Sequence, residues 1–190
     1  GVGDGVPTEI QRQYLGNGLV DVDVNVVQMA RAYAGLATGY LPKMSLVREI
    51  GGQPVPRKIA SLDIGQEHLE FVREALRRVV NSGRGSAYGK GLSEQELGFT
   101  LAAKTGSADY GPGLVPPFEG RGFPLDTYRL GTRKHTWVAG WFPADAPRYV
   151  HVVYLHDSSA TASHSAVYVA GQFLKEEAVQ KLMGVGEEGR

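Results

Sequence analysis

Leu101-Ala102-Ala103-Lys104-Thr105-Gly106-Ser107-Ala108 is the stretch that decides the fold of this chain. Its small and apolar residues predict a strand, which we place over residues 99–108. A lysine ammonium beside two hydroxyls on a strand combines charge with directional donors, as a carboxylate receptor requires. Gly106 removes side-chain bulk where an extended ligand would lie against the backbone. A solvent-facing lysine next to ordinary hydroxyl residues would have the same sequence, so these residues alone leave both interpretations open.

The residues after this stretch predict a mainly antiparallel sheet. Apolar alternation indicates strands at 136–142 and 148–156; Pro143 stops the first of them, and residues 144–147 form the turn. The last strand is apolar on both faces, which predicts burial on both sides. A helix at 165–183 follows, with an expected buried stripe of Val169, Phe173, Leu174, Ala178 and Leu182. The predicted fold class is α+β, an antiparallel sheet flanked by helices, with the Lys104 strand at an exposed edge.

The first half of the chain predicts two helices. One covers residues 25–37, because Asn25 is a good N-cap, Gln28 completes a capping box and Gly39 ends the pattern. The other covers residues 66–81, where apolar residues recur at helical spacing. Together with the last helix, these are expected to flank the sheet.

The remaining stretches are less regular. We expect a loop over residues 1–18, a short strand over 45–50 and a frayed tail over 184–190. The segment 109–134 is too long for a hairpin turn, and loops of that length are usually functional or disordered. We expect the whole chain, residues 1–190, to form a single domain.

Composition excludes several classes of protein. The chain has 190 residues, 42% hydrophobic and 21% charged, which is typical of a globular domain. Its formal net charge of zero argues against a general nucleic-acid-binding surface. The absence of cysteine excludes disulfides and thiolate chemistry. We find neither an apolar run long enough to span a membrane nor a signal-peptide pattern in these residues.

Histidines suggest two weaker sites. His135 opens a strand, where a structural role is the commoner one, although contact with an active site is the alternative. His151, His156 and His164 raise the question of a metal site. The first two are five residues apart on a strand and therefore face opposite sides, so we predict no metal.

Three further patterns are judged structural. Asp157-Ser158-Ser159 with His164 contains the residue types of a catalytic triad but is typical of a strand-to-helix loop. Residues 84–91 lack the glycine and the hydroxyl of a phosphate-binding loop. Trp137 and Trp141 share one strand face, where core packing is the expected role.

In order along the chain, several stretches resemble the transpeptidase domain of penicillin-binding proteins, especially the elongation-type enzymes. Gly16-Asn17-Gly18 stands where the family has Gly-Gln-Gly, and Asn25-Val26-Val27-Gln28-Met29-Ala30 resembles its Thr-Pro-Leu-Gln-Met-Ala helix. Gly85-Ser86-Ala87 resembles the Gly-Thr-Ala motif that follows a helix in the family. Lys104-Thr105-Gly106 matches the Lys-Thr-Gly motif, and His135-Thr136-Trp137 matches the His-x-Trp motif of the next strand. The resemblance covers roughly residues 14–175. An ordered series of this kind is far more specific than any one motif.

The resemblance implies a serine acyltransferase site. Lys104, Thr105, Gly106 and Ser107 would bind the carboxylate of a D-Ala-D-Ala stem peptide or of a β-lactam, which would pair with the strand. The backbone N–H of Ser107 would donate to the oxyanion. No metal or organic cofactor and no nucleic acid is implied. The whole protein would be anchored in the bacterial inner membrane, with this domain in the periplasm, and would act in peptidoglycan synthesis and cell shape.

Two motifs that the family needs are missing. None of the serines is followed three residues later by lysine, or two residues later by asparagine, so the nucleophile, its base and the proton relay are absent. In the family both motifs precede the counterpart of Gly16-Asn17-Gly18. We therefore expect a C-terminal fragment that is inactive alone. We also expect it to form a homodimer through the apolar surface that the upstream half of the domain would otherwise cover.

Whether the chain belongs to an active enzyme stays open at this stage. The alternatives are a non-catalytic transpeptidase-like module that binds a peptide or a partner protein, and the tail of a β-lactamase or β-lactam sensor. Ser-x-x-Lys and Ser-x-Asn motifs in the sequence upstream of Gly1 would indicate an enzyme, whereas a start codon with neither motif would indicate a binding module.

Overall fold

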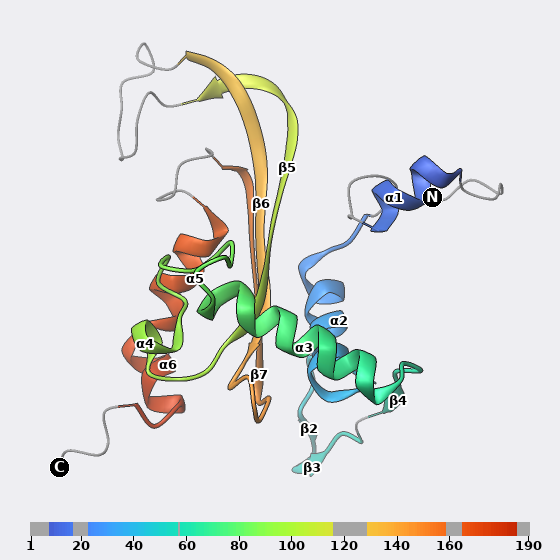
Figure 1. The fold of residues 1–190 in the computed structure, drawn as a ribbon. Coiled ribbons are helices and arrows are strands. Elements are labelled where there is room, and N and C mark those ends of the chain that lie inside the picture. Colours follow the sequence, from blue (N-terminus) through green and yellow to red (C-terminus); the bar gives the residue numbers. More distant parts are fainter. Residues whose placement is uncertain (1–7, 17–22, 57, 116–128, 159–164, 186–190) are drawn as a thin grey trace.

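A three-stranded antiparallel sheet forms the centre of the structure, a computed structural model that describes residues 8–16, 23–56, 58–115, 129–158 and 165–185. Its strands lie in the order β5-β6-β7, with bounds Ala102–Val115, Arg129–Phe142 and Tyr149–Ser158. Figure 1 shows this sheet nearly edge-on, with α5 and α6 on one side and α2 on the other. The expected α+β class and antiparallel sheet are therefore confirmed.

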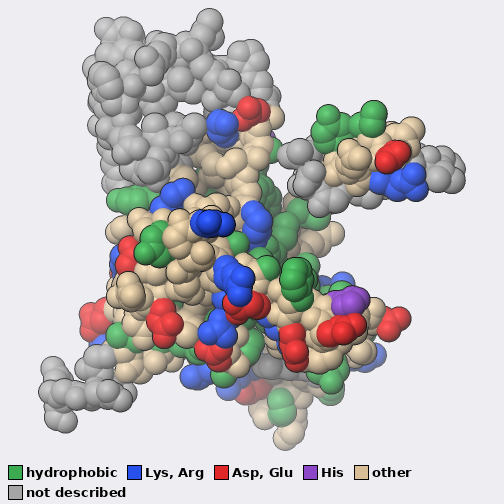
Figure 2. Space-filling model, in the orientation of Figure 1, with side chains coloured by type: hydrophobic (Ala, Val, Ile, Leu, Met, Phe, Trp, Pro, Cys, Tyr) green, Lys and Arg blue, Asp and Glu red, His purple; other side chains and the backbone are tan. Residues whose placement is uncertain are grey.

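Six shorter elements complete the fold. The strands β1 and β4 pair with each other, as do β2 and β3, and α1 and α4 are short helices. Their bounds are Glu9–Gly16 for α1, Tyr40–Pro42 for β1, Glu49–Ile50 for β2, Gln53–Pro54 for β3, Ile59–Ser61 for β4 and Glu94–Leu97 for α4. On the face seen in Figure 2, lysine and arginine side chains are interspersed with aspartate and glutamate, as the zero net charge leads one to expect.

The helices α2, Val26–Thr38, and α3, Gln66–Asn81, agree closely with their predictions. Asn25 accepts a hydrogen bond from the Gln28 backbone N–H at 2.9 Å, and the Gln28 side chain accepts from the Asn25 N–H at 2.9 Å. This is the expected capping box. Gly39 ends α2 in the left-handed region, at φ 82°, where a side chain would be strained.

Each face of the sheet packs into its own core, because alternate residues of a strand point to opposite sides. Ala103 and Val138 pack towards α5, with Leu101, Phe142 and Leu174. Ala102 and Trp141 pack towards α2 and α3, in a smaller cluster that also contains Ala37, Leu76 and Ala144. The half of the sheet that contains Ala102, Ala103 and Trp141 is therefore buried on both faces, and this part of β5 lies between two helical layers.

Two expectations for the first half are wrong in part. The loop expected over residues 1–18 contains α1, which begins after a Thr8 cap: Thr8 Oγ1 accepts from the Gln11 N–H at 3.2 Å, and the Gln11 side chain accepts from the Thr8 N–H. The strand expected over residues 45–50 is reduced to β2, Glu49–Ile50. Ser45 Oγ instead accepts from the Val47 N–H at 3.2 Å, and this local turn competes with strand pairing.

The terminal helix differs from its prediction in continuity and in its buried face. It divides into α5, Ala166–Leu174, and α6, Glu177–Leu182, because Glu176 is extended at ψ 140°. Val169, Phe173 and Leu182 are 38%, 51% and 55% exposed. The face that packs consists largely of smaller residues: Ala166, Val167, Ala170, Gly171 and Leu174. Close approach explains this choice, since a Cβ on Gly171 would lie only 3.2 Å from the Gly91 carbonyl oxygen.

The segment expected as a loop over residues 109–134 is strand at both ends. β5 continues to Val115 and β6 begins at Arg129, and these two residues pair across the hairpin. A register shift lies between Asp109 and Gly111. The connection over residues 116–128 lies outside the described residues, as does most of the expected tail over 184–190. None of the described helices is long and apolar enough to cross a membrane.

His151 provides a test of the core through pH. Its ring is buried, and neither nitrogen has a hydrogen-bond partner among the described residues. Burial lowers the pKa of His151 to about 4, so the folded protein holds this ring neutral while the unfolded chain binds a proton near the ordinary pKa. Stability is therefore complete above the unfolded value and falls as the pH drops towards 4.

We expect the free energy of unfolding to fall by about 3 kcal/mol from this group between about pH 7.5 and pH 4. Urea unfolding at both pH values measures it. The variant His151→Leu should lose that share of the pH dependence, whereas His68→Gln, at an exposed position of α3, should keep it. A His151→Leu protein with the same pH dependence as wild type would contradict the assignment.

Candidate active site

The Lys104-Thr105-Gly106-Ser107 stretch lies in the first half of β5, which is an edge strand of the sheet, as expected. Ala103 opposes Gly140, and the two backbones are close: a Cβ on Gly140 would lie 2.8 Å from the Ala103 Cα. Such proximity marks a non-hydrogen-bonded pair, whose backbone groups point away from the partner strand. By alternation, the N–H and C=O groups of Thr105 and Ser107 also point away from β6.

Side chains of the stretch divide between the two sides of the strand. Lys104 and Gly106 belong to the α2 side, whereas Thr105 and Ser107 belong to the other. The lysine chain nevertheless turns around the edge, because Lys104 Nζ donates to the Thr105 carbonyl oxygen at 2.8 Å. The structure thus brings the ammonium next to the outward backbone of Thr105, while the two hydroxyls lie on the opposite side.

A second loop reaches the same strand. Ser86 Oγ lies 2.7 Å from Thr105 Oγ1, which joins the loop after α3 to β5. Lys90, from the same loop, donates from Nζ to the Ser86 carbonyl oxygen at 2.8 Å. Sequence reasoning did not connect Ser86 with Thr105, because the two are nineteen residues apart and nothing local indicates their contact.

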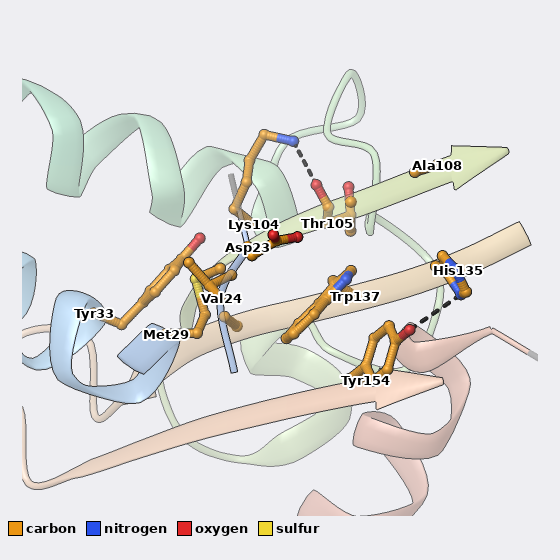
Figure 3. Close-up of a pocket in the computed structure, with 12 residues that line it drawn as sticks. Asp23, Val24, Met29, Tyr33, Lys104, Thr105, Ala108, His135, Trp137 and Tyr154 are labelled. Carbon is orange, nitrogen blue, oxygen red and sulfur yellow. Dashed lines mark hydrogen bonds between the residues drawn. The ribbon is translucent and has the colours of Figure 1, made fainter. Parts of the chain in front are cut away.

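On the α2 side the strand borders a cavity of about 460 Å³ (Figure 3). Its walls come from α2, the residues before it and all three strands of the sheet. Met29 and Tyr33 enter it from α2, and Lys104 and Trp137 from the sheet. Burial raises the pKa of Tyr33 to about 12.

Tyr154 and His135 line this cavity, and His156 contacts both of them. Tyr154 Oη lies 3.1 Å from His135 Nδ1 and 3.0 Å from His156 Nδ1, and the two imidazole rings are 4.5 Å apart. Trp137 stacks on Tyr154 with ring centroids 4.3 Å apart. His135 therefore faces the same cavity as Lys104, whereas the sequence left open whether this histidine is structural or contacts an active site. Tyr154 was not singled out from the sequence.

Other residues considered from the sequence do not line this cavity. His151 and His156 face opposite sides of β7, as predicted: the first is buried and the second is exposed. Within the described ranges, no group of three or more His, Asp or Glu side chains could hold a metal ion. Ser158 is buried and bonded to Thr136 at 2.9 Å. The rest of the triad pattern, Ser159 and His164, lies outside the described residues.

The two tryptophans share a face, as predicted, but differ in environment. Trp141 is fully buried against Tyr33, with ring centroids 6.4 Å apart. Trp137 is only half-buried and lines the cavity, so the expected core role fits the first tryptophan better than the second.

A family model identifies the class of protein to which this chain belongs. The model of the penicillin binding protein transpeptidase domain matches residues 3–176. The chain therefore belongs to the family of penicillin-binding protein transpeptidase domains. Comparison with curated proteins gives no significant match.

Solved structures show the same fold at low sequence identity. PBPA from Mycobacterium tuberculosis has a TM-score of 0.54 at 16% identity, over 86% of this chain and 33% of its own. The transpeptidase domain of penicillin-binding protein 3 from Burkholderia pseudomallei has a TM-score of 0.55 at 22% identity, over 86% of this chain and 43% of its own. Penicillin-binding protein 2X from Streptococcus thermophilus has a TM-score of 0.55 at 15% identity, over 96% of this chain and 28% of its own. The chain thus spans less than half the length of each of these structures.

Proposed function

We propose that this chain supplies the carboxylate-binding strand of a peptidoglycan D,D-transpeptidase. The observation that carries the proposal is the lysine at the outward edge of β5: Lys104 Nζ lies 2.8 Å from the Thr105 carbonyl oxygen, beside backbone groups that β6 leaves unpaired. An edge of this kind can accept an extended peptide as an additional strand. A cation at the same edge favours a peptide that ends in a carboxylate.

In this proposal Lys104, Thr105 and Ser107 hold the carboxylate of the D-Ala-D-Ala end, or of a β-lactam that resembles it. Thr105 and Ser107 are two residues apart, so their hydroxyls lie on one side of the strand and can share a carboxylate. The outward N–H of Ser107 donates to the developing oxyanion, an interaction worth about 3 kcal/mol in comparable acyl transfers. Gly106 leaves the strand surface open, because its nearest outside atom to a built Cβ is Trp137 Cβ at 3.5 Å.

The reacting serine and its lysine base lie, in the same proposal, in a segment outside these 190 residues. That segment would reach the cavity on the α2 side, where Lys104, Tyr33 and Trp137 are accessible. The reaction then needs no metal or organic cofactor, since a serine, a base and an oxyanion site suffice. Self-association of the isolated chain stays a prediction, as does the single-domain organisation of residues 1–190.

For the whole protein we propose an anchor in the bacterial inner membrane, with this domain in the periplasm. That location follows from the substrate, because stem peptides are joined outside the cytoplasm. A role in cell-shape maintenance belongs to the same proposal and would follow from elongation-type activity.

Labelling with a fluorescent penicillin tests the proposed function. The full-length protein should form a covalent adduct, whereas the isolated 190-residue chain should form none, because no serine in it is followed three residues later by lysine. Mass spectrometry after denaturation measures both. A stoichiometric adduct on the isolated chain would refute the missing nucleophile, and an unlabelled full-length protein would favour a non-catalytic binding module.

A further inference from the structure

The contact between Ser86 and Thr105 places a second hydroxyl behind the proposed carboxylate site. Their oxygen atoms are 2.7 Å apart, which is an ordinary O–H···O hydrogen bond. Each hydroxyl has one proton to donate and can also accept. Which of the two hydroxyls donates to the other depends on the second hydrogen-bond partner of Thr105 Oγ1.

The loop that carries Ser86 is held by its own backbone. The Gly85 N–H donates to the Ser82 carbonyl oxygen at 2.7 Å, and the Ala87 N–H donates to Val79 at 3.1 Å. Ala87 is fully buried. A Cβ on Gly85 would lie 2.2 Å from the Val79 carbonyl oxygen, so the loop passes closer to α3 than another residue would allow. These contacts fix Ser86 on both sides and direct it to β5.

A carboxylate ligand decides the direction of the Ser86–Thr105 bond. A carboxylate only accepts hydrogen bonds, so a Thr105 hydroxyl that binds it must donate its single proton to it. The lone pair of Thr105 Oγ1 is then available to accept from Ser86. Hydrogen bonds arranged in such a chain strengthen one another, because each donor is polarised by the bond that it accepts.

We propose that Ser86 is a positioning residue of this site, which donates to Thr105 Oγ1 and thereby directs the Thr105 proton to the ligand carboxylate. The proposal rests on the proposed function, because it needs a carboxylate at Thr105. Lys90 adds a further contact that holds Ser86 in place, because its Nζ donates to the Ser86 carbonyl oxygen at 2.8 Å. Ser86 thus makes the site selective for ligands with a free carboxylate over neutral analogues.

The test compares two ligands and three variants in the full-length protein. Acylation rate constants are measured with benzylpenicillin and with its methyl ester, which lacks the negative charge. Ser86→Ala should slow acylation by benzylpenicillin about three- to tenfold, the effect of one hydrogen bond, and should change acylation by the ester much less. Ser86→Thr keeps a hydroxyl and should restore most of the rate. Ser82→Ala removes a hydroxyl from the same loop and should leave both rates unchanged.

Two results would overturn the inference: a Ser86→Ala rate equal to wild type, or an equal loss with both ligands, which would indicate a general structural role. A melting temperature of Ser86→Ala close to that of wild type, as its exposed position predicts, excludes misfolding as the cause. Failure of the proposed function gives a different result, since the wild-type protein would then not be acylated by benzylpenicillin at all.

Discussion

Replacing Lys104 by alanine in the full-length protein is expected to slow acylation by a carboxylate-bearing β-lactam about 100-fold. The lysine brings the positive charge of the stretch to the edge of β5, with Nζ 2.8 Å from the Thr105 carbonyl oxygen. A ligand carboxylate at this edge would be bound by a charge-assisted hydrogen bond, which is about twice as strong as a neutral one. Removal of the ammonium also weakens the field at the reacting carbonyl, so both binding and the chemical step should suffer.

Folding should be unaffected by this change. Lys104 is exposed, and its side chain bonds only to its own strand among the contacts described. The melting temperature of Lys104→Ala should therefore equal that of wild type. Lys58→Ala, at an exposed position next to β4, is the matched control and should acylate normally. Acylation of Lys104→Ala at the wild-type rate, measured by stopped-flow with a fluorescent penicillin, would remove this lysine from the site.

Gly140→Ala should have the largest effect on stability, a loss of about 3 kcal/mol in the free energy of unfolding. Gly140 opposes Ala103 in the middle of the sheet. A Cβ there would lie 2.2 Å from the Ala102 carbonyl oxygen and 2.7 Å from the Ala103 Cβ. Backbone cannot move away as a flexible side chain can, so β5 and β6 would have to separate. That movement would displace Lys104 and Thr105, and acylation should fall with stability.

Gly106→Ala is the control for this substitution, because it makes the same change in the neighbouring strand. A Cβ on Gly106 meets only Trp137 Cβ at 3.5 Å, an ordinary contact. Its unfolding free energy should stay at or slightly above the wild-type value, since alanine also restricts the unfolded chain. Urea unfolding of both variants measures the difference. A Gly140→Ala protein as stable as Gly106→Ala would mean that the two strands are not as close as described.

Much of the fold could be predicted from the sequence because its signals are local. The capping box at Asn25 and the amphipathic pattern over Gln66–Asn81 depend on neighbours within one or two helical turns, and both were confirmed. α1 was missed although Thr8 and Gln11 carry the same capping signal, because glycines before and after it favoured a loop.

The terminal helix shows where a local pattern fails. Hydrophobicity alone favoured Phe173 and Leu182 as buried, yet both are exposed. Ala170 and Gly171 pack instead, since the loop at Gly91 comes too close for larger side chains. Which face of a helix packs depends on the shape of the opposing surface, and that shape is not written in the helix itself.

The sequence alone determined that Lys104-Thr105-Gly106-Ser107 lies in a strand and that its side chains alternate between two faces. It also determined the family. Only the tertiary structure decided that Lys104 turns around the edge, that Ser86 lies 2.7 Å from Thr105 Oγ1, and that Tyr154 joins His135 at the cavity. The physical reason is range. Strand alternation and capping act between neighbours along the chain, whereas the contacts of Ser86 with Thr105 and of Tyr154 with His135 join residues nineteen apart, which meet only after the sheet and both cores have formed. The turn of Lys104 joins neighbours, but it depends on β5 being an edge strand, and strand order is also a tertiary property.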